Sequence, residues 1–224
     1  MSFATLPNAK TKDPTDAQDT PIVFVVDDDV SVRESLELLL QSAGWRPEMF
    51  ASAAEFLTRQ RVDVPSCLVL DVSLPDLNGL ELQKRIAGDR SEMPIIFITG
   101  YGDVPMTVRA MKAGAAEFLT KPFSDDVLLS AVSGAIERSR AALSDESAVR
   151  EIRERYASLS RREREVMALV VSGKLNKQVG GELHISEITV KAHRGNVMRK
   201  MQADSLAALV KIAARLGLSA SRSA

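Results

Sequence analysis

The stretch CLVLDVSLPDLNG, residues 67–79, decides how this chain folds. Its first four residues, Cys67–Leu70, are apolar, and Asp71 follows them directly. A short, wholly apolar run is expected for a strand that is covered on both faces of a parallel sheet. Comparable runs occur on either side, so the sequence predicts five strands, at residues 22–26, 47–50, 67–70, 95–99 and 117–120.

Amphipathic stretches separate these strands and predict helices. In the first of them Val32, Leu36, Leu39 and Leu40 recur at helical spacing. The predicted helices cover residues 30–43, 52–58, 79–87, 104–113 and 124–138. This alternation predicts an α/β domain with a doubly wound, five-stranded parallel sheet and right-handed crossovers. In such a sheet, ligands bind outside the carboxyl ends of the strands.

The rest of the chain has a different character. Residues 1–20 are polar without apolar periodicity, which predicts a disordered leader before a first domain at 21–138. The charged, Ala-rich residues 139–158 predict a helical linker. From Leu159 the pattern is purely helical, which predicts a four-helix domain at 159–216 and a short tail at 217–224.

Composition excludes several classes of protein. Hydrophobic residues make up 45% of the chain and charged residues 26%, as in an ordinary globular protein. No apolar run approaches the roughly 20 residues that span a bilayer, and the N-terminus does not resemble a secretory signal. The single cysteine, Cys67, excludes an internal disulfide and a multi-cysteine zinc site. We therefore expect a cytoplasmic protein without a membrane partner.

Charge is distributed unevenly along the chain. Residues 21–123 hold 10 Lys and Arg against 15 Asp and Glu, whereas residues 159–224 hold 12 against 5. An acidic first domain and a basic second one indicate different partners for the two.

Carboxylates follow two of the predicted strands. Asp27, Asp28 and Asp29 come after the first strand, and Asp71 comes after the third. If these strands are neighbours, the carboxylates share one crevice and repel each other unless a cation compensates. Mg²⁺ is a hard cation that takes carboxylates, waters and phosphate oxygens. The alternative is a solvated acidic turn in which Asp28 or Asp29 caps the next helix.

Two further strand ends favour phosphoryl chemistry. The fourth strand ends at Thr99 and the fifth is followed by Lys121. A carboxylate can serve as the nucleophile, a metal ion can neutralise charge, and a lysine and a hydroxyl can hold phosphate oxygens. Each residue alone has an ordinary structural explanation, but four strand ends in this order favour a phosphate site.

Residues 21–138 resemble the receiver domain of bacterial response regulators. The motifs that carry the resemblance occur in the family's order: VFVVDDD, LVLDVSLPDLNG, FITGYGD and EFLTKPF. The resemblance implies a flavodoxin-like strand order 2-1-3-4-5 and phosphorylation of Asp71 by a sensor histidine kinase. It further implies a cis peptide bond between Lys121 and Pro122, and Lys121 as a partner of the phosphate. The Mg²⁺ ligands that it implies are Asp27, Asp28, Asp71 and the backbone carbonyl of Ser73.

The same resemblance implies how phosphorylation would change the conformation of the domain surface. Thr99 and Phe118 match the family's switch pair, in which the hydroxyl moves inward and the ring rotates into the space left behind. Core packing is the alternative explanation for Phe118, and the two explanations are compatible. The resemblance further implies that the surface from Asp103 to Lys121 reshapes and acts as the face of a phosphorylation-dependent homodimer. Within this surface, DVPMTVRAMKAGA resembles the FixJ branch of the family.

Helix signals recur in the basic C-terminal segment. Ser160 and Glu163 form a capping box, and Gly173 ends the helix that they open. We expect Asn176 to cap a second helix, and Ser186 to start a third with Ile188, Val197 and Met201 facing inward. A fourth helix is predicted at 205–216. Two helices joined by a short turn, the second of them basic, are typical of DNA recognition.

NKQVGGELHISEITVKAHRGNVMRKM resembles the LuxR/NarL-type helix-turn-helix. The resemblance implies that Lys191 and Ala192 face base edges of double-stranded DNA. His193 is ambiguous between the DNA backbone and packing on the helix surface, with the backbone favoured. The phosphate contacts implied are Asn176, Lys177, Thr189, Arg194 and Arg199. Gly180-Gly181 departs from the family, because each glycine costs about 1 kcal/mol relative to alanine inside a helix.

Together these features predict a phosphorylated, dimeric response regulator of the FixJ/NarL type that controls transcription, with RNA polymerase as a further candidate partner. A phosphohydrolase is disfavoured, because a second acid two residues after the nucleophile would be needed and Ser73 stands there. The remaining alternative is a constitutive DNA binder with a structural receiver. The cognate kinase, the stimulus, the target promoters, the sign of regulation and the linker geometry stay open.

Overall fold

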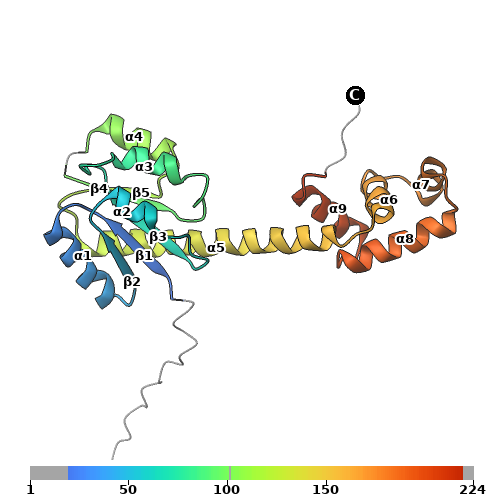
Figure 1. Cartoon of the computed structure of the whole chain (residues 1–224), viewed down its shortest axis with the longest axis horizontal. Helices are drawn as coiled ribbons and strands as arrows, with labels where there is room; N and C mark the ends of the chain where they lie inside the picture. The colour runs from blue at the N-terminus through green and yellow to red at the C-terminus, as the bar shows by residue number, and fades with distance from the viewer. Residues whose placement is uncertain (1–19, 101, 219–224) are drawn as a thin grey trace, which may run out of the picture. The chain divides into compact units, whose positions relative to one another are not determined.

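The computed structural model describes residues 20–100 and 102–218. These residues divide into two compact units, one that ends at Leu143 and one that begins at Ser144 (Figure 1). Residues 1–19, with nearly all of the predicted leader, and residues 219–224 lie outside the described part of the chain.

The first unit is a doubly wound α/β sheet. All strand pairs are parallel and the order is β2-β1-β3-β4-β5, which confirms the predicted fold. Asp71 is the last residue of β3 rather than the first residue after it. The elements of this unit are β1 Ile22–Val26, α1 Val30–Ser42, β2 Arg46–Phe50, α2 Ala53–Thr58, β3 Ser66–Asp71, α3 Gly79–Ile86, β4 Ile95–Thr99, α4 Val104–Lys112, β5 Glu117–Thr120 and the first part of α5 Asp125–Ala157, whose residues from Ser144 on belong to the second unit.

Alternate residues of the central strands enter two different cores. In β1, Phe24 packs with α2, α3 and α4 on one face of the sheet, whereas Val25 packs with α1 and α5 on the other. Figure 1 shows these helices around the sheet. β1, β3 and β4 are buried at every position, and burial on both faces explains why their sequences carry no alternating apolar and polar pattern.

Helix α5 runs through most of residues 139–158, the stretch predicted as a linker. Its Ser139 is buried and accepts a hydrogen bond from the backbone N–H of Ser66 at 3.0 Å, which ties the helix to the start of β3. Among the helices of residues 20–100 and 102–218, none combines the length and apolarity needed to cross a membrane.

The second unit has the four predicted helices, α6 Arg161–Val171, α7 Asn176–Leu183, α8 Glu187–Lys200 and α9 Leu206–Arg215. Ser160 and Glu163 form the expected capping box, and Ser186 caps α8. The prediction that Asn176 caps α7 is wrong. Leu175 occupies that position, its N–H bonds to the side chain of Gln178 at 2.8 Å, and Asn176 is the first helical residue.

The prediction that Ile188 faces inward is also wrong, because 81% of its side chain is exposed. Val190, Val197 and Met201 are the buried residues of this region. Ile188 lies two residues before Val190, which is about 200° away around a helix, so it must face outward once Val190 faces the core.

Gly180 and Gly181 have opposite environments. A β-carbon at Gly180 would lie 2.8 Å from the backbone oxygen of Ile185, so this glycine is required where α7 approaches the turn before α8. A β-carbon at Gly181 would meet no atom within 4 Å.

Candidate functional sites

The strand register assembles an acidic pocket at one edge of the sheet. Val26 pairs with Leu70, so Asp27, the residue after β1, and Asp71, the last residue of β3, come side by side. On the other side of β3, Thr99 pairs with Thr120, and the N–H of Lys121 donates to the carbonyl of Thr99 at 2.8 Å. Strand order and register thus bring together residues that are far apart in the sequence.

Lys121 bridges two carboxylates in this pocket. Its Nζ lies 2.7 Å from Asp27 Oδ2 and 2.7 Å from Asp71 Oδ2. The other oxygens are also engaged, since Asp27 Oδ1 accepts from the N–H of Asp29 at 3.0 Å and Asp71 Oδ1 from that of Ser73 at 2.8 Å. Asp27 and Asp71 are buried, and Lys121 is half-buried.

Burial and pairing act in opposite directions on these groups. Burial raises the pKa of Asp27 above its ordinary value, although the hydrogen bond from Lys121 partly offsets this. Burial would lower the pKa of Lys121, but the hydrogen bonds to Asp27 and Asp71 outweigh it and raise that pKa. Lys121 is therefore an ammonium group at neutral pH.

The donor set of the pocket fits a hard divalent cation. Asp27, Asp28 and Asp71 each offer a carboxylate oxygen, and these oxygens lie within 4.8 Å of one another. Asp28 is exposed, so a hydrated ion can reach the site. Asp29 lies outside this group and caps α1, accepting from the N–H of Ser31 at 2.8 Å, as the alternative for the acidic turn expects.

Two residues that support the pocket were not found from the sequence. Arg33 donates from Nη1 to the backbone oxygen of Asp27 at 2.7 Å. The carboxylate of Asp76 accepts from the N–H groups of Ala53 and Ala54, which joins the turn after β3 to the start of α2. Contacts of this kind link distant positions, and a single sequence carries no signal for them.

Thr99, Phe118 and Gly102 lie against each other beside the pocket. Thr99 is fully buried, and Phe118 is half-buried with its ring centroid 6.1 Å from that of Phe97. A β-carbon at Gly102 would lie 3.2 Å from the Phe118 ring and 2.8 Å from Thr120 Cγ2. The Lys121–Pro122 peptide bond is cis, as expected.

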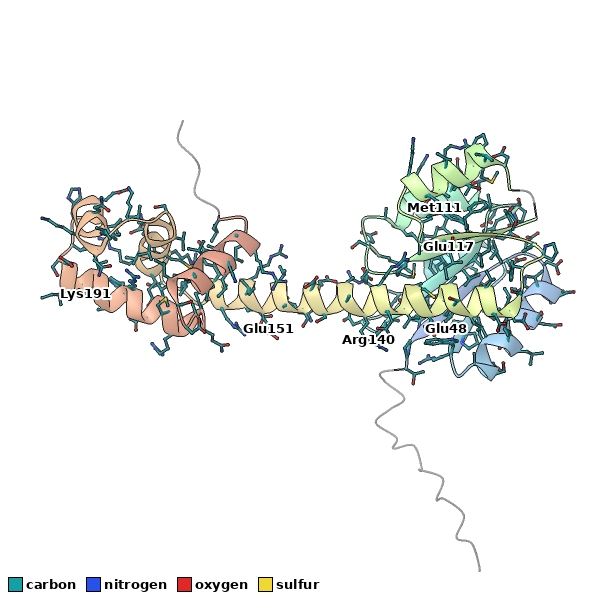
Figure 2. All side chains as sticks on the ribbon, turned by 180° about the vertical axis from the view of Figure 1, so that it is seen from behind. Glu48, Met111, Glu117, Arg140, Glu151 and Lys191 are labelled. Carbon is teal, nitrogen blue, oxygen red and sulfur yellow. The ribbon has the colours of Figure 1, made fainter. Side chains whose placement is uncertain are left out.

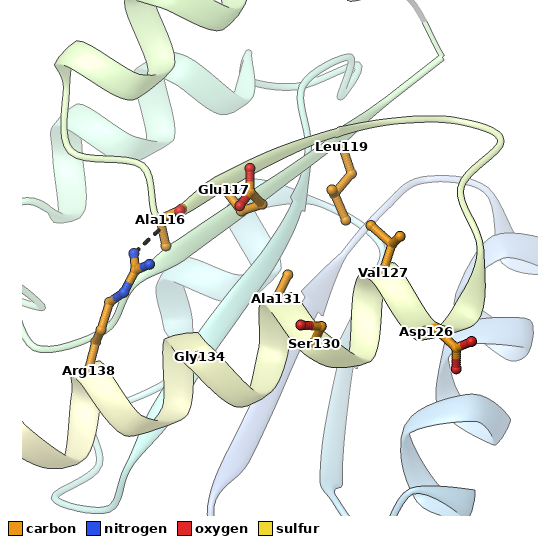
Figure 3. A pocket seen from close by; sticks show the side chains of 9 residues that line it. All are labelled: Ala116, Glu117, Leu119, Asp126, Val127, Ser130, Ala131, Gly134 and Arg138. Atoms are coloured by element: carbon orange, nitrogen blue, oxygen red, sulfur yellow. Dashed lines mark hydrogen bonds between the residues drawn. The ribbon is translucent and has the colours of Figure 1, made fainter.

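A separate groove of about 460 Å³ lies between β5 and α5 (Figure 3). Arg138 crosses one end and donates to the backbone oxygen of Ala116 at 3.3 Å. None of the residues predicted as site residues lines it. We therefore assign it no part in the chemistry of the acidic pocket.

The eight residues predicted to contact DNA all lie on α7 and α8. Lys191 is 65% exposed and stands on α8 (Figure 2), with Nζ 4.0 Å from Glu187 Oε1. Asn176 Oδ1 accepts from Arg194 Nη1 at 3.1 Å, so these two residues connect α7 to α8. The exposed members of the set are Lys177, Lys191, Ala192 and Arg199, and the half-buried ones are Asn176, Thr189, His193 and Arg194.

Known proteins resemble this chain along most of its length. Residues 23–133 match the response regulator receiver domain, and residues 157–213 match the luxR family of bacterial regulatory proteins. Nodulation protein W of Bradyrhizobium diazoefficiens is 52% identical over 206 residues, which cover 92% of this chain and 91% of that protein.

Transcriptional regulatory protein FixJ of the same species is 44% identical over 196 residues, covering 88% of this chain and 96% of FixJ. The solved structure of response regulator StyR has a TM-score of 0.77 at 45% identity, covering 88% of this chain and 99% of StyR.

Proposed function

Because the chain belongs to the two-component response regulators that join a receiver to a LuxR-type DNA-binding domain, we propose that phosphorylation of Asp71 controls its DNA binding. Members of this family regulate transcription and are not enzymes. The proposed receiver spans residues 21–138 and the proposed DNA-binding domain 159–216, both acting in the cytoplasm. The convergence of Asp27, Asp71 and Lys121 at one sheet edge carries the proposal.

The phosphoryl donor would be a phosphohistidine on a sensor kinase. A carboxylate oxygen of Asp71 attacks the phosphorus and forms a new P–O bond. The P–N bond to the kinase histidine breaks, and the imidazole of that histidine is the leaving group. Asp27, Asp28, Asp71 and the Ser73 carbonyl would hold Mg²⁺, which when bound neutralises charge on the phosphoryl oxygens. Lys121 is already in contact with Asp71 and, as an ammonium group, can pair with a phosphoryl oxygen.

The change at Asp71 would pass to the surface through Thr99 and Phe118. Helix α4 carries an exposed apolar row with spacing i, i+4, i+7, formed by Val104, Val108 and Met111 (Met111 is labelled in Figure 2). Val104 is 77% exposed and the other two are 43% exposed. A second copy that covers this row would remove apolar surface from water, which supports a dimer through this face.

A dimer would place two DNA-binding domains on one duplex. The half-sites would lie about one helical turn apart, roughly 10–10.5 bp. Lys191 and Ala192 would face base edges, and Asn176, Lys177, Thr189, His193, Arg194 and Arg199 would position the helices on the backbone. Contact with RNA polymerase at such a site would complete the regulatory role.

The full-length chain provides the test. We expect Mg²⁺ with beryllofluoride, a phosphoryl mimic, to increase both dimerisation in sedimentation experiments and affinity for selected DNA. Asp71→Asn should show neither increase while it keeps the basal affinity. Equal dimerisation and DNA affinity with and without the mimic would contradict the proposal and favour constitutive DNA binding with a structural receiver.

A further inference from the structure

The most exposed large apolar side chain in the described part of the chain is that of Ile188. It is the second residue of α8, the helix that carries Lys191 and Ala192. At this exposure most of the apolar surface of Ile188 lies in water, and its removal from water by an apolar group would be favourable. The position of Ile188 on the helix decides which partner could provide that contact.

The phase of α8 gives the direction in which Ile188 points. Val190, Val197 and Met201 form the buried stripe of α8. An outward stripe about 140–200° away around the helix consists of Ile188, Ala192, Gly195 and Arg199, which are all exposed, and exposed Lys191 borders it. Ile188 thus shares one surface with the residues proposed to contact DNA. It lies at the N-terminal end of α8, and in helix-turn-helix proteins the N-terminal residues of the second helix contact base edges.

Two features favour DNA as the occupant of this surface. Arg199 and Lys191 are exposed cations that match the charge of phosphates. Ala192 and Gly195 lie between them on the stripe and have little or no side chain, so the helix backbone can approach a groove closely. The apolar group on base edges in the major groove is the thymine methyl.

We propose that Ile188 is a specificity-determining residue that packs against the 5-methyl group of a thymine in each half-site. This inference rests on the proposed function, since it requires α8 to lie in the major groove. An isoleucine is stiff at χ1, so little freedom is lost when the contact forms. Burial of one methyl group corresponds to a roughly three- to fourfold change in affinity, and this factor applies to each half-site.

The test begins with duplexes selected from a random double-stranded library by the full-length chain with Mg²⁺ and beryllofluoride. Each thymine of the selected site is then replaced by deoxyuridine, which removes only the 5-methyl group. For the unmodified chain we expect one thymine per half-site at which this replacement weakens binding about three- to fourfold. For Ile188→Ala the same replacement should have no effect.

Two matched variants complete the design. Ile188→Val keeps a branched apolar group and should retain the sensitivity to deoxyuridine at the same position. Leu175→Ala removes another exposed apolar side chain of this unit, 71% exposed and outside α8, and should leave that sensitivity unchanged. Circular dichroism would show that all three variants keep the fold.

The outcomes separate this inference from the proposed function. Selection of a defined site without any methyl dependence, or with a dependence that survives in Ile188→Ala, overturns the role of Ile188 alone. A failure of the chain to enrich any sequence overturns the proposed function and this inference with it. Loss of the methyl dependence in Ile188→Ala, with its retention in Ile188→Val, supports the contact.

Discussion

A single residue, Lys121, joins the two buried carboxylates of the acidic pocket. Its ammonium group contacts Asp27 and Asp71 at 2.7 Å, and backbone N–H groups hold the remaining carboxylate oxygens. A divalent cation must therefore share these carboxylates with Lys121. A carboxylate oxygen has two lone pairs, so it can accept from an ammonium group and still bind a metal ion.

Alanine substitutions at the neighbouring residues Gly180 and Gly181 should have opposite effects on stability. Gly181→Ala should raise the free energy of unfolding of the second unit by about 0.5–1 kcal/mol, because a β-carbon there meets open space. Gly180→Ala should lower it, because the same atom would lie 2.8 Å from the Ile185 carbonyl. Urea denaturation followed by circular dichroism measures both, and equal effects of the two substitutions would contradict this assignment.

The start of α6 is connected to the end of α8 by an ion pair between Glu163 and Lys200. Glu163 accepts from the N–H of Ser160 at 2.8 Å and from Lys200 Nζ at 2.7 Å. The hydrogen bond from Lys200, followed by that from the Ser160 backbone, lowers the pKa of Glu163 below its ordinary value of 4.5. The ionised carboxylate thus stabilises the folded helices.

This lowered pKa predicts a pH dependence. A carboxylate with a depressed pKa in the folded state contributes stability above its ordinary pKa, and loses it as the pH falls through 4.5 and then through the folded-state pKa. Glu163→Gln should cost about 1 kcal/mol at pH 7. Unfolding of both proteins at decreasing pH should show the difference shrinking, and a constant difference would exclude the ion pair as its source.

The sequence predicts most elements correctly because their signals are local. Apolar runs identify the strands, and the residues after them identify Asp71, Thr99 and Lys121 as neighbours once the strands are parallel. Apolarity alone predicts that Ile188 is buried, whereas its position two residues before buried Val190 places it on the outer face of α8. The side chain of Asn176 accepts from Arg194 on α8 and does not cap α7, and this long-range bond exists only once the two helices pack together.

At the scale of the whole molecule, the proposed switch depends on self-association through α4. Val108 lies in the middle of the exposed row that Val104 and Met111 complete. Its side chain contributes to the proposed dimer face and is 43% exposed, so a charged replacement does not disturb the core. A substitution at Val108 can therefore change dimerisation without changing the stability of the receiver.

Val108→Glu should therefore weaken dimerisation in the presence of Mg²⁺ and beryllofluoride at least tenfold, since it buries a charge without a partner in the interface. Affinity for DNA with two half-sites should fall, whereas affinity for a single half-site should stay the same. Sedimentation and fluorescence anisotropy measure the two properties. Leu38→Glu introduces the same charge at a 69% exposed apolar residue of α1, outside this face, and serves as the control. Undiminished dimerisation of Val108→Glu would exclude this face.

Gly102 keeps space free beside the aromatic ring of Phe118, because only a hydrogen atom faces the ring at this position. A methyl group at this position would crowd the ring and the neighbouring Thr120 at once. In the proposed switch this ring rotates when Asp71 is phosphorylated, so Gly102→Ala should fix its orientation and make dimerisation independent of the aspartate.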